Sequence, residues 1–458
     1  MRPLALSSRW FAAIFIAATA CSGLLGCAGH ESRVASALNA LDRGAPNEAI
    51  AALDQELGVA TQNDAPALDG DNALLLLDRG TVLQSIDEWK ASARDLGAAD
   101  KAIDILDLSR GASADIGKYL FSDSAGPYKG PAYEKLMINT VNLVNYLALA
   151  DTTGAKVEAR RLAVMQKYVR DHEEEEGLLG LGSYLAGFAF EKGGDHDEAL
   201  NYYDEALRHA QYGSLRDPLR ALTHGKKHSN GIDALIGDAG PLAPIEETGE
   251  AELLIVIGFG RVPQKIPKRI PIGLALTLVA HDISPDDRAQ ANALAARGAV
   301  TWVNFPTLGP SKGSYSVPTF DLDGKAQRLE QALNVEAEVR AAWEKKEPTI
   351  ILSAITRMVT RMAAGAITEG ATRAAGGKDA GVAAVGLLLG LASTITLTAL
   401  DTPDTRGWST LPARLAVARL RVPAGEHEIT LGARGEQKRV KVTLEKGGWA
   451  LVPLMTLR

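Results

Sequence analysis

Apolar residues recur every three or four positions from residue 31 to about residue 211, the spacing at which side chains share one face of an α-helix. The clearest case is residues 136–148, where two neighbouring apolar faces form one wide surface (Leu136, Thr140, Leu143 and Leu147; Met137, Val141, Val144 and Ala148). Asn139, Asn142 and Asn145 form a polar stripe beside it, and buried amides require hydrogen-bond partners. The pattern predicts a long helix packed on both flanks.

Residues 196–207 resemble the second helix of a tetratricopeptide repeat. Ala199 and Ala206 would let helices approach closely, and Tyr203 would fill the space between them. Ala91 and Ala98 repeat the same seven-residue spacing, although the repeat units are not evenly spaced. We therefore expect residues 27–214 to form a degenerate, tetratricopeptide-like solenoid whose concave face binds a protein partner.

The pattern changes after residue 214. Residues 215–250 are rich in polar residues, glycine and proline, which predicts a linker. Residues 251–258 form a continuous apolar run typical of a buried strand, and further strands are expected at 300–305 and 314–322, with a turn at Asp323-Gly324. Residues 251–334 therefore predict a small α/β or β unit.

Helical periodicity returns in residues 335–400, a segment that becomes rich in glycine and alanine. Residues 381–400 carry no charge and are long enough to cross a bilayer, but their serine and threonine content favours burial against the preceding helix. Residues 401–458 contain four strand-length stretches, which predicts a small β-sandwich or half of one. The predicted fold class is α+β.

The N-terminus has the layout of a secretory signal. Arg2 and Arg9 precede the apolar stretch 10–20, and Leu24-Leu25-Gly26-Cys27 resembles a bacterial lipobox. We expect a signal peptide over residues 1–26 and a diacylglycerol on Cys27; Cys21 is a weaker alternative site, and an ordinary signal peptide or an N-terminal membrane helix remains open. In a lipoprotein, Ala28 after the lipid site suggests the outer membrane and a periplasmic location.

The composition of the chain excludes some classes of protein and of binding site. The formal charge of −7 argues against a general nucleic-acid binder, and 458 residues with 46% hydrophobic and 23% charged residues suit two to four folded domains. No cysteine follows Cys27, so the mature chain is expected to have no internal disulfide and no thiolate metal site.

Five stretches together resemble an uncharacterised group of tetratricopeptide-bearing bacterial lipoproteins. They are the lipobox, residues 74–84 (LLLLDRGTVLQ), the PYKGPAYEKLMIN stretch from Pro127, the helix at Arg357–Arg361, and residues 404–427 (DTRGWSTLPARLAVARLRVPAGEH). Members of this group appear near lipoproteins that activate penicillin-binding proteins. The resemblance implies a role in the cell envelope and supplies no catalytic residue.

Motifs for catalysis or metals are weak. Three acidic stretches could suggest a metal site, but each has a simpler explanation. Residues 171–176 (DHEEEE) fit a solvated helix end, Asp195-His196-Asp197 fit helix caps, and residues 321–324 (DLDG) fit a turn. Gly258-Phe259-Gly260 lacks the third glycine of a dinucleotide fingerprint, and Pro263 would block the helix that should follow. We expect no metal, no cofactor, no catalytic set and no enzymatic activity.

Two groups of residues are candidates for binding. Tyr128, Lys129, Tyr133, Arg160 and Arg161 would form a partner-binding surface, unless Tyr133 packs at a helix start and the arginines lie along the helix surface. The second group, Arg261, Lys265, Lys268 and Arg269, would form an anion-binding loop, with a solvated loop as the alternative.

Two functions follow from these patterns. The first is a lipid-anchored envelope scaffold that binds a protein partner through its helical array, with a possible link to peptidoglycan or envelope assembly. The alternative is a periplasmic ligand-binding or hydrolytic protein with a site beside the basic 258–272 loop. A deep pocket containing Arg261, Lys265 and a carboxylate with a shifted pKa would favour the alternative.

Overall fold

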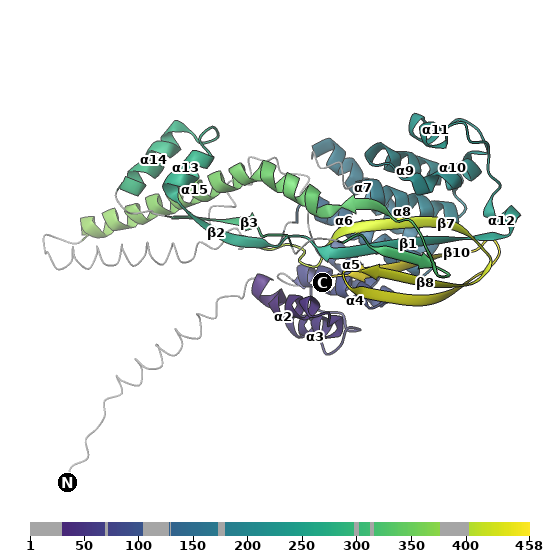
Figure 1. The fold of residues 1–458 in the computed structure, drawn as a ribbon. Helices are drawn as coiled ribbons and strands as arrows, with labels where there is room; N and C mark the ends of the chain where they lie inside the picture. Colours follow the sequence, from purple (N-terminus) through teal and green to yellow (C-terminus); the bar gives the residue numbers. More distant parts are fainter. Residues whose placement is uncertain are drawn as a thin grey trace, which may run out of the picture.

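The structure is a computed structural model that describes residues 30–68, 72–103, 128, 130–172, 179–296, 302–311, 316–375 and 403–458. The lipid-site candidates Cys21 and Cys27, the partner candidate Lys129, the carboxylates Glu173–Glu176 and the apolar segment 381–400 lie outside these residues. The described chain is a mixed α+β protein (Figure 1).

The N-terminal part consists of four consecutive antiparallel helix pairs. They are α2 (His30–Asp42) with α3 (Pro46–Leu57), α4 (Asn72–Ser85) with α5 (Trp89–Ala102), α6 (Ala132–Ala148) with α7 (Thr152–His172), and α8 (Leu179–Lys192) with α9 (His196–His209). Each second helix also contacts the first helix of the next pair, so the pairs form one array.

The turns inside the four pairs share one geometry. Gly44, Asp87, Ala150 and Gly194 each have a positive φ and each lie two residues before the second helix. In every turn the next residue donates its N–H to the carbonyl five residues back, at 2.9 to 3.0 Å. This left-handed ending is common at helix C-termini. The repetition therefore exists in the backbone even where the sequences differ.

The shared turn defines equivalent positions. Ala49, Ser92, Ala155 and Ala199 are each the fourth residue of a second helix, and all are buried. The sequence comparison of Ala91 with Ala199 was therefore one residue out of register, because Ser92 is the equivalent residue.

The equivalent positions also explain two glycines. A Cβ on Gly80 would lie 2.9 Å from Leu96, and a Cβ on Gly187 would lie 2.6 Å from the Tyr203 ring. Glycine is needed there because the large side chain of the second helix occupies the space.

Two four-stranded sheets follow the helices. The first sheet has the order β10-β1-β7-β6, from β10 (Trp449–Thr456), β1 (Glu250–Arg261), β7 (Pro412–Pro423) and β6 (Glu330–Asn334). β1 is parallel to β10 and antiparallel to β7. The second sheet has the order β5-β4-β8-β9, from β5 (Lys325–Ala326), β4 (Thr319–Leu322), β8 (Gly425–Ala433) and β9 (Glu436–Leu444).

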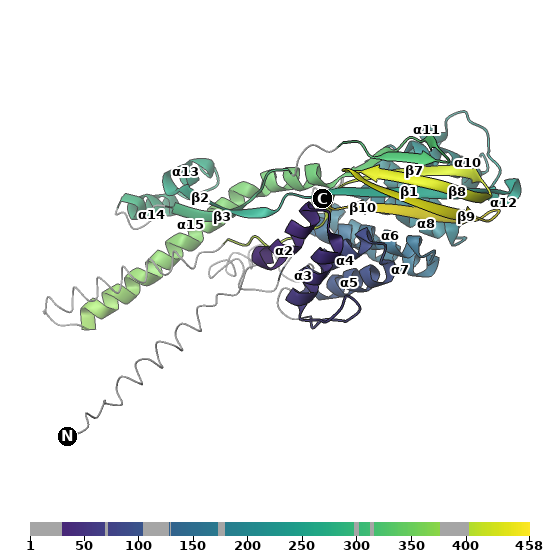
Figure 2. The same cartoon turned by 60° about the horizontal axis from the view of Figure 1, so that its bottom comes forward.

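The first sheet is the middle of three layers. Alternate β1 side chains belong to different cores: Leu254 and Val256 pack with the helices, whereas Leu253, Ile255 and Ile257 pack with the second sheet. Figure 2 shows the helices on one side of these strands and β8 and β9 on the other. A strand buried on both faces must be apolar throughout, which explains the continuous hydrophobic run.

The predicted division into a central unit (251–334) and a C-terminal β domain (401–458) differs from the structure. Both sheets contain strands from both stretches, because β1 pairs with β7 and β10 in the first sheet and β4 pairs with β8 in the second. The sandwich is therefore larger than expected. The predicted linker 215–250 begins at the last residue of η4 (Gly213–Leu215). It contains three helices, α10 (Arg216–Thr223), α11 (Asn230–Ile236) and α12 (Ile245–Thr248).

A separate arm leaves this body. It consists of β2 (Lys265–Pro271), α13 (Ile272–Leu278), α14 (Pro285–Ala296), β3 (Trp302–Leu308) and the part of α15 (Val335–Ala375) that packs on them. Its own core includes Ile270, Phe305, Ile351 and Ile355. Figures 1 and 2 both show the arm projecting from the end of the body at which α2 begins.

Candidate functional site

Residues 404–411, here named the strap, bridge the helices α4 and α6. Trp408 is buried; its backbone N–H donates to Glu134 Oε1 over 3.1 Å, and its indole N–H donates to Thr81 Oγ1 over 3.0 Å. The Thr410 N–H donates to Asp78 Oδ1 over 2.9 Å. The strap therefore fixes the start of β7 against the first helices of two pairs.

Glu134 is the central acidic group of this region. Its Oε2 accepts the Tyr128 hydroxyl over 2.7 Å, while Oε1 accepts the Trp408 N–H. Burial raises the pKa of Glu134, although the charge of Lys265 and the two hydrogen bonds act in the opposite direction. Burial and the nearby Glu134 charge raise the pKa of Tyr128 well above its usual value, so Tyr128 remains a hydrogen-bond donor.

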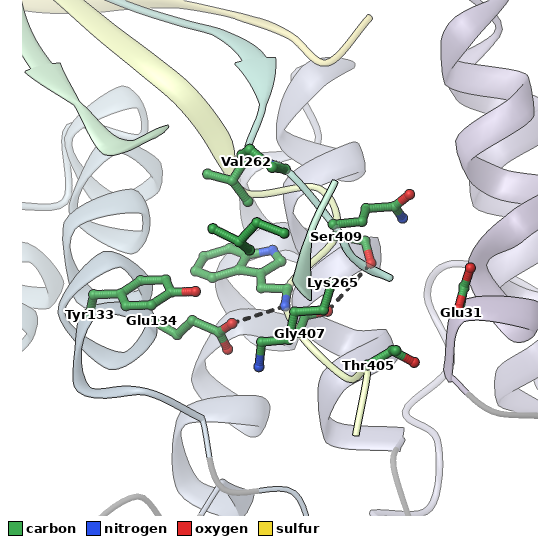
Figure 3. Close-up of a pocket in the computed structure, with 12 residues that line it drawn as sticks. Glu31, Tyr133, Glu134, Val262, Lys265, Thr405, Gly407 and Ser409 are labelled. Carbon is green, nitrogen blue, oxygen red and sulfur yellow. Dashed lines mark hydrogen bonds between the residues drawn. The ribbon is translucent and has the colours of Figure 1, made fainter. Parts of the chain in front are cut away.

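A small cavity lies where the strap, α6 and the root of the arm meet (Figure 3). Figure 3 shows Tyr133 and Glu134 on one side, Glu31 of α2 on the other, and Lys265 and Gly407 between them. The cavity volume is about 20 Å³, roughly the space for one water molecule. It brings together Lys265 and a carboxylate with a raised pKa, but it has no room for an organic substrate.

Asp78 forms the other polar contact of the strap. Asp78 Oδ1 accepts the Thr410 hydroxyl over 2.9 Å, and Oδ2 lies 3.2 Å from His30 Nε2. All three residues are buried. This cluster connects the first residue of α2 to the strap through α4.

A second charged cluster joins the helices to the first sheet. Arg419 of β7 donates to both oxygens of Glu252 at 2.7 and 2.9 Å, to Glu191 of α8 at 2.6 Å, and to the Tyr203 hydroxyl at 2.8 Å. Lys192 also pairs with both carboxylates. Burial alone would raise the pKa of Glu191, but the Arg419 and Lys192 charges lower it, so Glu191 is ionised.

A cavity of about 100 Å³ lies beside this cluster, and its lining includes Glu191, Lys192, His196, His224 and Arg421. Glu191 and Lys192 already have partners within the cluster. The charged groups therefore serve first to hold α8 against the sheet.

The predicted partner-binding residues separate into two groups. Tyr128 and Tyr133 are buried near the strap, so neither is available as a surface anchor. Arg160 lies 5.4 Å from the centre of the Phe190 ring, and Arg161 lies 3.4 Å from Glu158. The expectation of one surface containing both groups is therefore not met for the tyrosines, because apolar burial and the Glu134 hydrogen bond draw Tyr128 inward.

The arginines belong to an exposed stripe on α7 that the sequence reading did not identify. Val157, Arg160, Arg161 and Val164 are spaced three, four and seven residues apart, which places them on one helix face. Val157 is 45% exposed and Val164 is 64% exposed. The signal in the sequence that could have identified this face is the pair of valines seven residues apart. We name these four residues the α7 stripe.

The predicted basic loop is dispersed in the structure. Arg261 is buried at the end of β1 and pairs with Asp42, and Lys265 donates to the Arg406 carbonyl over 2.9 Å. Only Lys268 and Arg269 are exposed, and both lie on strand β2. The four cations do not form one anion site, because a buried guanidinium requires a carboxylate partner.

No three histidine, cysteine or acidic side chains in the described part of the chain are placed to hold a metal ion. None of the helices described is both long enough and apolar enough to cross a membrane.

Comparison with known proteins does not identify a family for this chain. No family model matches the chain, and no curated protein matches it. Among solved structures, the crystal structure of MamA aligns with 39% of this chain and 77% of its own, at 17% identity and a TM-score of 0.26. At that score the likeness carries no argument about fold or function.

Proposed function

We propose that this protein is a lipid-anchored scaffold of the bacterial cell envelope, held by a diacylglycerol on Cys27, and that its helical array of the tetratricopeptide kind presents the α7 stripe to a protein partner. The observation that carries the proposal is that the α7 stripe is exposed, whereas the inner face of the helical array is packed against the rest of the protein. The envelope location rests on the lipobox sequence. The proposal includes no catalytic step and no nucleic acid.

The inner face of the array supports an external binding surface. Every residue from Ala73 to Gln84 of α4 and from Leu179 to Phe190 of α8 is buried. The strap and the first sheet pack against these first helices. The concave face expected to bind a partner is therefore filled by the protein itself, which leaves the outer surfaces for recognition.

The α7 stripe has the chemistry of a contact surface. Two exposed valines supply apolar area, and Arg160 and Arg161 flank them with positive charge. Apolar residues surrounded by arginine are typical of interface cores and rims. A partner of this stripe would carry an apolar patch bordered by acidic residues.

The small cavity beside Lys265 argues against the alternative of a ligand-binding or hydrolytic protein. Arg261 is absent from its lining, and its volume of about 20 Å³ suits roughly one water molecule. Glu134 already accepts two hydrogen bonds from the protein. These groups are better placed to hold the strap than to act on a substrate.

The proposal is tested by photocrosslinking of the full lipidated chain in intact envelopes. A photoreactive residue at Val157 or at Val164 should give the same partner adduct, and Val164→Asp should remove the adduct formed from position 157. The matched control is position Leu68, another exposed aliphatic residue, which should not give that adduct. Absence of an adduct from both α7 positions, or an identical adduct from Leu68, would overturn the proposed partner surface. The mass of the N-terminal peptide tests the lipid separately.

A further inference from the structure

The arm carries an unusual share of the exposed apolar side chains. Eight large hydrophobic residues are exposed in the described part of the chain, and four of them lie on the arm: Ile266, Leu274, Leu278 and Trp302. The arm already has its own core, so these side chains are not needed to fill it. They form apolar surface that no other described part of the protein covers.

The arrangement of these residues is local. Leu274 and Leu278 are four residues apart on α13, which places them on one helix face, and they are 49% and 52% exposed. Trp302 is 44% exposed and pairs with Pro271, the residue that directly precedes α13. The exposed leucines and the indole therefore belong to one end of the β2–β3 ribbon.

Positive charge adjoins this apolar group. Arg269 lies 5.5 Å from the centre of the Trp302 ring, whereas Lys268 is on the opposite face of β2, 5.7 Å from the centre of the Phe305 ring. Carboxylates at Asp282 and Asp286 lie further along the chain, after the end of α13. Tryptophan beside basic residues is the pairing that proteins place at the level of lipid headgroups.

The position of the arm agrees with a membrane nearby. α2 begins at His30, three residues after Cys27, so a diacylglycerol on Cys27 would hold the start of α2 within about 10 Å of the bilayer. Glu31 of α2 and Lys265, the first residue of β2, line the same small cavity. The arm leaves the body at that end (Figures 1 and 2).

We infer that the arm is a second membrane contact, in which Leu274, Leu278 and Trp302 enter the headgroup region of a bilayer and Arg269 meets anionic phospholipid. This inference rests on the proposed envelope location. A diacylglycerol on Cys27 would hold only the N-terminus at the bilayer, so a second contact of apolar and basic residues would fix the orientation of the protein on the membrane.

The test uses the chain from residue 28 to residue 458, which lacks both cysteines and contains every described residue. The protein is sedimented with vesicles of phosphatidylethanolamine and phosphatidylglycerol, and with neutral phosphatidylcholine vesicles. Binding to the anionic vesicles is expected, weakened by salt and reduced about tenfold by the double variant Leu274→Glu, Leu278→Glu. Leu68→Glu, which changes an equally exposed leucine away from the arm, should bind as the parent does.

A second measurement reports on Trp302 itself. Brominated phospholipid should quench the tryptophan fluorescence of the parent, and the quenched component should disappear in Trp302→Phe. The leucine variant should keep the thermal midpoint of the parent, because exposed side chains contribute little to stability. A lower midpoint would show that these leucines are covered in solution, and would overturn the inference.

Absence of binding by the unlipidated chain, or binding insensitive to Leu274→Glu, Leu278→Glu, would also overturn it. Because this chain has no Cys27, neither result depends on acylation, so failure of the arm and failure of the lipid anchor are separate outcomes. Equal binding to neutral and anionic vesicles would refute the role of Arg269.

Discussion

Trp408 donates its indole N–H to Thr81 Oγ1 over 3.0 Å, and this bond connects residues that are far apart in the sequence. Trp408 is among the largest fully buried side chains of the described protein. The strap therefore depends on one aromatic side chain to hold it against α4.

Trp408→Ala should lower the free energy of unfolding by about 3 to 5 kcal/mol, because it removes a large buried ring and leaves a cavity. Trp408→Phe keeps most of the apolar volume and loses only the hydrogen bond to Thr81, so it should cost about 1 to 2 kcal/mol. Urea unfolding followed by circular dichroism measures both. Equal losses for the two variants would contradict the packing role of the ring.

Arg419→Met should destabilise the protein by about 3 kcal/mol or more, because Glu252 and Glu191 would stay buried with less compensating charge. Adding Glu252→Gln should recover at least about 1 kcal/mol, since Lys192 can then neutralise Glu191. The measurement is a double-mutant cycle in urea. Strict additivity of the two single changes would refute the proposed coupling.

Gly187→Ala should cost about 1 to 3 kcal/mol, because its Cβ would meet the Tyr203 ring. Gly97→Ala is a matched control in the interior of α5, where an added Cβ meets no atom within 4 Å. Since alanine is the better helix former, that control should gain about 0.5 to 1 kcal/mol. A lower thermal midpoint for Gly187→Ala and a higher one for Gly97→Ala, each relative to the parent, would support the repeat geometry. A stabilising effect of Gly187→Ala would exclude it.

His427 should make stability depend on pH. Its Nδ1 lies 2.7 Å from Asp323 Oδ2 and its Nε2 lies 2.8 Å from the Pro423 carbonyl, so the doubly protonated ring satisfies both acceptors. Burial alone would lower the pKa of His427, but these two hydrogen bonds raise it overall. A raised folded-state pKa means that the contribution is complete below the unfolded value of about 6.5 and is lost as the pH rises through the folded value.

The comparison of wild type with His427→Gln tests this sign. The difference in thermal midpoint should be largest near pH 5 to 6 and should shrink towards about pH 9. Asp323 acts at the other end of the range: its pKa is lowered, mainly by the His427 hydrogen bond, so its contribution is lost as the pH falls through the folded value. A midpoint difference that does not change from pH 5 to pH 9 would contradict the assignment to His427.

Local features of the fold could be predicted from the sequence. The long helix at 136–148 and its buried asparagines are found as expected: Asn139 donates to Glu158 over 2.6 Å, and Asn145 donates to Ser92 over 2.9 Å. The turn at Asp323-Gly324 also forms, with both residues at positive φ as a two-residue hairpin requires. The helix and the turn depend on residues close together in the chain, whereas the partners of the asparagines come from other helices.

The candidate site could not be predicted in the same way. Nothing near Arg261 in the sequence indicates that Asp42 will neutralise it, and nothing near Tyr128 indicates that Trp408 will share Glu134 with it. The strand at 251–258 was predicted, but its partners were not, because an apolar run indicates burial on both faces without naming its neighbours. Long-range pairing decided where each predicted residue lies.

The parallel pairing of β1 with β10 also constrains how the chain acquires its structure. The helix pairs close over short loops, whereas β1 pairs with a strand roughly 200 residues later in the sequence. During synthesis, the apolar β1 segment would emerge long before the strand that covers its edge. A chain of this topology would therefore need protection of β1 from aggregation until its last strand arrives, and we expect folding to be limited by that late closure.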